Sequence, residues 1–215
     1  SASSGGPAPA MGAAAMAAPA REKALWEAAS HGNVPEVVSL LDSGAMTDWA
    51  NDDAFRSAPL AAAVRHGRDA VVRVLLDRGA NPEAKDTSGY TAVMVAVVTG
   101  QLDLVSMLLD AGADIEATND GRLTPLLLCM VADQDDVARH LIDRGANVDA
   151  KDSGGHTPLI WAALRRNSAM VRLLLERGAD ASARESRGMT ALSTCRNDEC
   201  RAVLRRVEPL QRWHR

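Results

Sequence analysis

Cysteine and histidine side chains are the groups in this chain whose chemistry would suit a nucleophile, a general base or a metal ligand. Cys195 and Cys200 are separated by four residues, and His214 follows them. Zinc sites built on cysteine pairs use tighter spacings and need a fourth ligand, so free or buried thiols are the simpler interpretation. We predict no metal site here.

The remaining reactive groups also have structural explanations. His31 and His66 stand at equivalent places just before a glycine, which indicates a helix end rather than a catalytic base. The acidic pairs at 52–53, 135–136 and 198–199 lie in turns or helix starts, where carboxylates favour the helix dipole. No phosphate-binding loop, dinucleotide glycine fingerprint, zinc-protease motif or nucleophile elbow occurs. The sequence predicts no enzyme activity, no cofactor and no small-molecule substrate.

Composition favours helices around a sizeable core. Of 215 residues, 47% are apolar but only 3% are aromatic, so the core is mostly Ala, Val, Leu and Met. The net charge of −4 gives no general basic field, and we expect no nucleic acid as a partner. A local exception is the tail from Arg201 to Arg215, with five arginines and Trp213, which could bind RNA or an acidic partner.

Three cysteines and the absence of an Asn-x-Ser/Thr site predict a reducing, intracellular compartment, the cytoplasm or nucleus. The chain begins with Ser1 instead of Met, which leaves import into an organelle open. No apolar stretch suits a membrane span. Residues 1–20 carry no charge and are expected to form a flexible linker, unless a partner orders them.

Two motifs that repeat in phase indicate the elements that position any binding residues. A Gly-Ala dipeptide begins at residues 44, 79, 112, 145 and 178, with a spacing of 33 residues after the first interval of 35. A second motif of the Thr-Pro-Leu type begins at residues 58, 91, 124, 157 and 190. The shared period predicts a tandem array of similar units.

Each unit reads as two helices and a loop. The Thr can cap a first helix, and Pro follows it at the first helical position in three units. A second helix then ends at the Gly-Ala, where glycine can adopt the left-handed conformation. About ten polar residues with turn formers follow, which suits a projecting hairpin.

This pattern, Gly-Ala-Asx followed by Ala-x-Asp-x-x-Gly-x-Thr-Pro-Leu, resembles the ankyrin repeat. The resemblance implies an all-α solenoid of about six helix-turn-helix repeats with hairpin-like loops and a concave groove. We expect the array over residues 21–208, with Pro209 ending the last helix, and a basic tail over 209–215. The expected repeats are 21–52, 53–85, 86–118, 119–151, 152–184 and 185–208.

The chain departs from the family at two kinds of position. The His of the family's Thr-Pro-Leu-His motif is absent, and Met94, for example, stands there, so its hydrogen-bond network with Thr is lost. The glycine between the two helices becomes Asp133 and Arg166 in later repeats. Arg tolerates a positive φ poorly, so Arg166 implies either a changed turn or about 1 kcal/mol of strain.

The resemblance implies that hairpin tips and the ends of the first helices contact a protein partner. These positions are unusually apolar, and a contiguous apolar stripe of this kind marks an interface unless neighbouring hairpins cover it. The candidate partner-binding residues are Phe55, Tyr90, Val98, Leu123, Val131, His156, Leu164 and Met189.

The leading hypothesis is therefore a non-enzymatic protein-binding module or adaptor. One alternative is a structural subunit of a larger assembly, anchored by the N-terminal arm and the basic tail. Another is a chaperone or targeting factor that shields apolar client segments in the groove.

Overall fold

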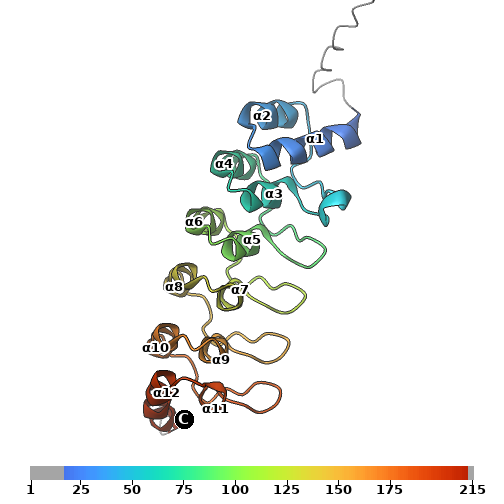
Figure 1. Ribbon diagram of the computed structural model, residues 1–215. Coiled ribbons are helices and arrows are strands. Elements are labelled where there is room, and N and C mark those ends of the chain that lie inside the picture. Colours follow the sequence, from blue (N-terminus) through green and yellow to red (C-terminus); the bar gives the residue numbers. More distant parts are fainter. Residues whose placement is uncertain (1–16, 213–215) are drawn as a thin grey trace, which may run out of the picture. The chain divides into compact units, whose positions relative to one another are not determined.

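The computed structural model describes residues 17–212, and side chains up to residue 206. Within this range the chain is built from helices, and the one strand-like feature is an isolated bridge between Asn51 and Ser57 (Figure 1). The all-α class is confirmed. Most of the expected linker over residues 1–20 and the end of the basic tail lie outside the described residues.

The chain divides into two compact units, one up to Asn81 and one from Pro82 onward, and each is described by itself. The first unit has two helix pairs, in which α1 packs on α3 and α2 on α4. Its helices are α1 (Ala18–His31), α2 (Val34–Asp42), α3 (Pro59–Arg65) and α4 (Asp69–Asp77), with the short 3-10 helix η2 (Asp52–Ala54) in the connection.

The second unit has four helix pairs in a row, each preceded by a loop that projects to the same side (Figure 1). The first helices of the pairs pack on one another in chain order. They are α5 (Ala92–Val98), α7 (Pro125–Ala132), α9 (Pro158–Leu164) and α11 (Ala191–Thr194). Their partners are α6 (Leu102–Asp110), α8 (Asp135–Asp143), α10 (Ser168–Glu176) and α12 (Asp198–Arg212).

The Gly-Ala dipeptides end the second helices as predicted. Gly112 has φ 91° and follows α6 directly after Ala111, and the amide of Ala113 donates to the carbonyl of Leu108 at 3.0 Å. This bond closes the last turn and buries the alanine. The other four glycines, at 44, 79, 145 and 178, also have positive φ.

The helix starts agree with the sequence in all but one respect. Pro125 and Pro158 begin α7 and α9, and the hydroxyls of Thr124 and Thr157 accept a bond from the amide three residues later. The expected cap fails at Thr91 before α5. Its hydroxyl is buried and has no hydrogen-bond partner among the described residues.

The turn between paired helices keeps its left-handed residue even where glycine is lost. Gly100 has φ 71°, while Asp133 has φ 55° and Arg166 has φ 59°. Of the two alternatives for Arg166, the unchanged turn with its conformational cost is the one that the structure adopts.

The two ends of the helical part extend further than expected. Helix α1 begins at Ala18, before residue 21, because Pro19 is compatible with a first helical turn and the flanking alanines favour helix. Helix α12 continues to Arg212, so the expectation that Pro209 would end it is wrong. A proline removes its own backbone hydrogen bond, but the residues after it can still take helical angles.

Side-chain hydrogen bonds connect successive repeats at the Asx that follows Gly-Ala in the second unit. In the second unit, an acidic residue of one repeat accepts a hydrogen bond from the amide of this Asx in the next repeat. The pairs are Glu83 with the amide of Asp114 at 2.8 Å, Glu116 with that of Asn147 at 2.7 Å, and Asp149 with that of Asp180 at 2.8 Å. These bonds set the register between stacked repeats.

Candidate functional site

Exposed apolar side chains lie at the C-terminal ends of the first helices in the second unit. Val98 is 42% exposed, Val131 36% and Leu164 43%, although the rest of these helices is largely buried. Met189, in the loop before α11, is 38% exposed and shares a pocket with Leu164. We call these four residues the apolar column. Their exposure means that the neighbouring loops leave them partly open to solvent.

Three other predicted residues lie in the projecting loops. Tyr90, Leu123 and His156 occupy the loop position equivalent to Met189, and each is half-buried instead of exposed. Phe55 is 74% exposed, but it belongs to the first unit. The second unit therefore brings together seven of the eight candidates on its loops and first-helix ends.

Each projecting loop is held by one polar side chain at its base. An oxygen of Asp86 accepts hydrogen bonds from the amides of Ser88 and Tyr90. Asn119, Asp152 and Glu185 do the same in the next three loops. The amide of Arg187, followed by that of Met189, holds the pKa of Glu185 below its ordinary range. The loops are thus ordered by their own polar groups.

Neighbouring loops are also bonded to one another. The amides of Asp120, Ser153 and Ser186 each donate to a carbonyl of the preceding loop, at 3.2, 3.1 and 2.9 Å. These bonds connect the loops from Ser88 to Ser186 into one row. Loops that are bonded in this way change their conformation little on binding, which lowers the entropic cost of association.

His156 has a structural environment. Its Nδ1 lies 3.2 Å from an oxygen of Asp152, and its ring lies 5.3 Å from that of Trp161. The indole nitrogen of Trp161 donates to the second oxygen of Asp152 at 3.0 Å. The buried Asp152 therefore fixes both rings at the base of the loop, and no nucleophile completes a catalytic set among these residues.

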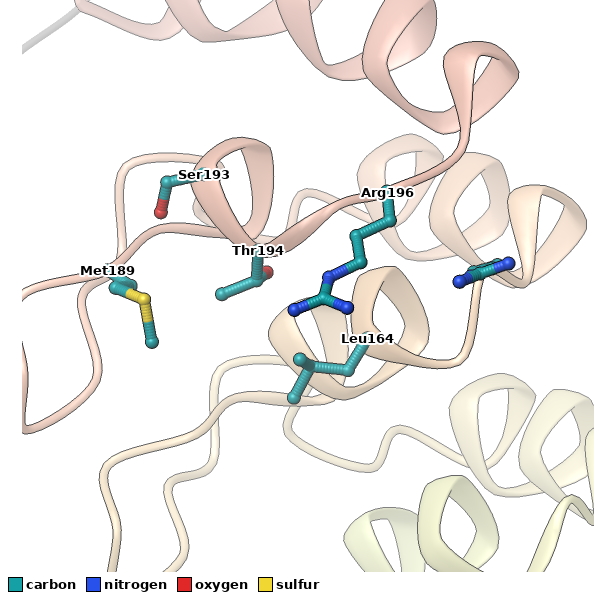
Figure 2. A pocket seen from close by; sticks show the side chains of 6 residues that line it. Leu164, Met189, Ser193, Thr194 and Arg196 are labelled. Carbon is teal, nitrogen blue, oxygen red and sulfur yellow. The ribbon is translucent and has the colours of Figure 1, made fainter.

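A pocket of about 290 Å³ lies at the C-terminal end of the apolar column. Leu164 and Met189 form its apolar walls, and Figure 2 shows the side chain of Arg196 directed toward Leu164. Arg166, Ser193 and Thr194 complete the lining. The sequence predicts strain at Arg166 but not this pocket, for which the arginine in place of a turn glycine is the one signal.

The cysteines are not exposed nucleophiles. Cys129, Cys195 and Cys200 are free and buried. Burial raises the pKa of the Cys129 thiol and that of Cys200. Residues 17–206 contain no group of three or more His, Cys, Asp or Glu side chains placed to hold a metal ion.

The described part of the arginine-rich segment from Arg201 to Arg215 has a partly structural role. Nε of Arg201 donates to the carbonyl of Cys195 at 2.9 Å, which ties α12 to the preceding loop. Arg205 and Arg206 are exposed, whereas Trp213, His214 and Arg215 lie outside the described residues. Within residues 17–212, the chain has no helix of the length and apolarity needed to cross a bilayer.

A family model for ankyrin repeats matches residues 25–119, 81–152 and 116–185, which together cover most of the chain. The chain is also similar to parts of several characterised proteins. It is 34% identical over 76 residues to the chicken (Gallus gallus) "Arf-GAP with coiled-coil, ANK repeat and PH domain-containing protein 2", covering 35% of this chain and 10% of that protein.

Two further relatives come from other lineages. The chain is 40% identical over 82 residues to the Caenorhabditis elegans "Transient receptor potential cation channel subfamily A member 1 homolog", covering 38% of this chain and 7% of that protein. It is 34% identical over 71 residues to the Schizosaccharomyces pombe "Ankyrin repeat-containing protein P1E11.10", covering 33% of each. The chain thus spans a third or less of each of these relatives.

Proposed function

Because the chain belongs to the ankyrin-repeat family, whose repeats are generally protein–protein interaction modules, we propose that it is a non-enzymatic adaptor that binds a protein segment along its apolar column. The column is defined by Val98, Val131, Leu164 and Met189. Tyr90, Leu123 and His156 flank it from the loops, and Phe55 is a separate contact on the first unit. The proposed partner is a protein, not a nucleic acid or a small-molecule substrate.

The observation that carries this proposal is the exposure of the column. Val98, Val131 and Leu164 stand at equivalent places on stacked helices, and each keeps more than a third of its surface in solvent. Burying such side chains against a partner removes apolar surface from water, at roughly 25 cal/mol per Å². Exposed apolar groups that recur over several repeats are typical of interfaces.

The mechanism is rigid presentation. The loops are bonded to one another and to their own side chains, so the column exists before binding. Affinity then comes from a few central apolar contacts with a polar rim around them. A reducing intracellular compartment, the cytoplasm or nucleus, remains our proposal for where the chain acts.

The test is an affinity purification with a column variant in which Val98, Val131 and Leu164 are all changed to Gln. The matched control changes Met46 and Leu102 to Gln, since these are also exposed large apolar residues but lie outside the column. We expect the column variant to lose the partners that the wild type and the control retain, with unchanged helical circular dichroism. Equal recovery by all three proteins would reject the proposal.

A further inference from the structure

The pocket at the end of the column contains two arginines whose charge is not used inside the molecule. Arg166 and Arg196 both line the pocket, and both are exposed. Neither guanidinium group has a hydrogen-bond or ion-pair partner among the side chains and backbone that the structure describes. The neighbouring Arg165 differs, because it pairs with Asp133 and with the carbonyl of Val131.

The two hydroxyl groups of the pocket are already hydrogen-bonded. The hydroxyl of Ser193 donates to the carbonyl of Thr190 and accepts a hydrogen bond from the amide of Thr190. The hydroxyl of Thr194 donates to the carbonyls of Thr190 and Ala191. Among the side chains that line the pocket, the donors left without a partner are therefore those of the two guanidinium groups.

The loops that carry these arginines are held in place. Nδ2 of Asn197 donates to the carbonyl of Arg166 at 3.5 Å, which links the turn after α9 to the loop before α12. Cys195 is buried, and its carbonyl accepts the bond from Arg201. Arg196 thus projects from a loop that is fixed on both sides.

We propose that this pocket binds an acidic side chain, Asp or Glu, that lies next to a large aliphatic residue in the partner segment. Guanidinium groups bind carboxylates through charge-assisted, often bidentate hydrogen bonds. Leu164 and Met189 supply the apolar walls for the aliphatic residue and for the stem of the acidic side chain.

This inference rests on the proposed function and adds a preference to it. The acidic residue would set the direction and register of a segment that runs from the pocket along the column toward Val131 and Val98. Apolar contacts alone would leave that register weakly defined, whereas a charge placed at one end specifies it.

The test uses the full chain and a displayed library of random twelve-residue peptides. We expect the selected peptides to be enriched in Asp or Glu within two positions of Leu, Ile, Met or Phe. One selected peptide is then made with its acidic residue and with the corresponding amide, and both are titrated by fluorescence anisotropy. A phosphoserine version of the same peptide forms a third arm.

The variants are R166Q/R196Q and a charge-matched control, R139Q/R205Q, in which two exposed arginines outside the pocket are changed. We expect R166Q/R196Q to weaken binding of the acidic peptide about tenfold, and the control to change it less than about twofold. On R166Q/R196Q the amide peptide should bind as well as the acidic peptide. The change in the protein and the change in the peptide remove the same interaction, so their effects should not add.

If the losses of affinity from R166Q/R196Q and from the peptide amide were additive, the inference would be overturned. Selected peptides without acidic enrichment would overturn it as well. Tighter binding of the phosphoserine peptide than of the acidic one would also overturn it and assign the pocket to phosphate. Selected peptides that lack acidic residues but fail to bind the column variant would reject this inference while the proposed function stands. Peptides indifferent to both the column and the arginine variants would reject both.

Discussion

Arg165 and Arg166 are adjacent in the chain but differ in how their charges are used. Arg165 is paired with Asp133 and with the carbonyl of Val131, whereas the guanidinium of Arg166 has no partner among the described side chains and backbone. Arg166 also has φ 59°, in a turn where other repeats have glycine. An unpaired charge held in a costly backbone conformation is more readily explained by binding than by stability.

Replacing Arg166 by glycine separates a role of this residue in binding from a role in stability. The substitution relieves a left-handed conformation that costs an L-residue about 1–2 kcal/mol, partly offset by the larger entropy of glycine in the unfolded chain. We expect the free energy of unfolding in urea to stay the same or rise by up to about 1 kcal/mol, while binding of the acidic peptide weakens. A fall in stability of more than about 1 kcal/mol would contradict this reading of the turn.

Thr91 and Thr157 stand at equivalent helix starts but are predicted to respond in opposite ways to replacement by valine. The buried hydroxyl of Thr91 lacks a partner among the described residues, so Thr91→Val should raise the free energy of unfolding by about 1 kcal/mol. The hydroxyl of Thr157 accepts a bond from the amide of Ile160 at 3.3 Å, so Thr157→Val should lower it by about 1 kcal/mol. Urea denaturation of both variants checks the prediction, and equal effects of the same sign would refute it.

Stability should fall in acid partly through Glu185. Its folded pKa lies below the ordinary value because the amides of Arg187 and Met189 donate to the carboxylate. The stabilisation is therefore present above the ordinary Glu pKa of about 4.3 and is lost as the pH falls through the lower, folded value.

The substitution Glu185→Gln keeps an acceptor for these amides but removes the titration. We expect the melting temperature of the wild type to exceed that of Glu185→Gln at pH 7, and the difference to shrink on acidification below about pH 4. A difference between the two melting temperatures that does not change with pH would show that the Glu185 carboxylate is not the titrating group.

The three thiols allow a test of the expectation that the chain has no cysteine chemistry. Burial raises the pKa of Cys129 and of Cys200, and both side chains are buried along with that of Cys195. The native chain should react with a thiol reagent at neutral pH only as fast as it opens, and urea should expose all three groups. Rapid native labelling of one cysteine would indicate a reactive thiol and reopen the question of enzyme activity.

Local signals in the sequence predicted the repeats, because a glycine at positive φ or a proline at a helix start acts within a few residues. The exposure of Val98, Val131 and Leu164 also follows from their shared place at the end of a helix. The Arg166–Arg196 pocket was not predictable in this way. It depends on two loops thirty residues apart and on a last repeat whose first helix, α11, has only four residues.

The failed cap at Thr91 has a similar origin. The same threonine accepts a hydrogen bond at 124, 157 and 190, so the motif alone does not distinguish Thr91 from its equivalents. Pro209 does not end α12, because the proline loses only its own backbone hydrogen bond and the chain remains helical beyond it.

Photo-cross-linking from inside the column tests the central claim most directly. Benzoylphenylalanine placed at Val131 reports contact at the column, and the same group at Leu102, an exposed apolar position on α6, serves as the control. We predict that the protein partner recovered with the wild type forms a covalent adduct from position 131 and not from position 102. Adducts from position 102 with none from position 131 would show that the partner binds a different face.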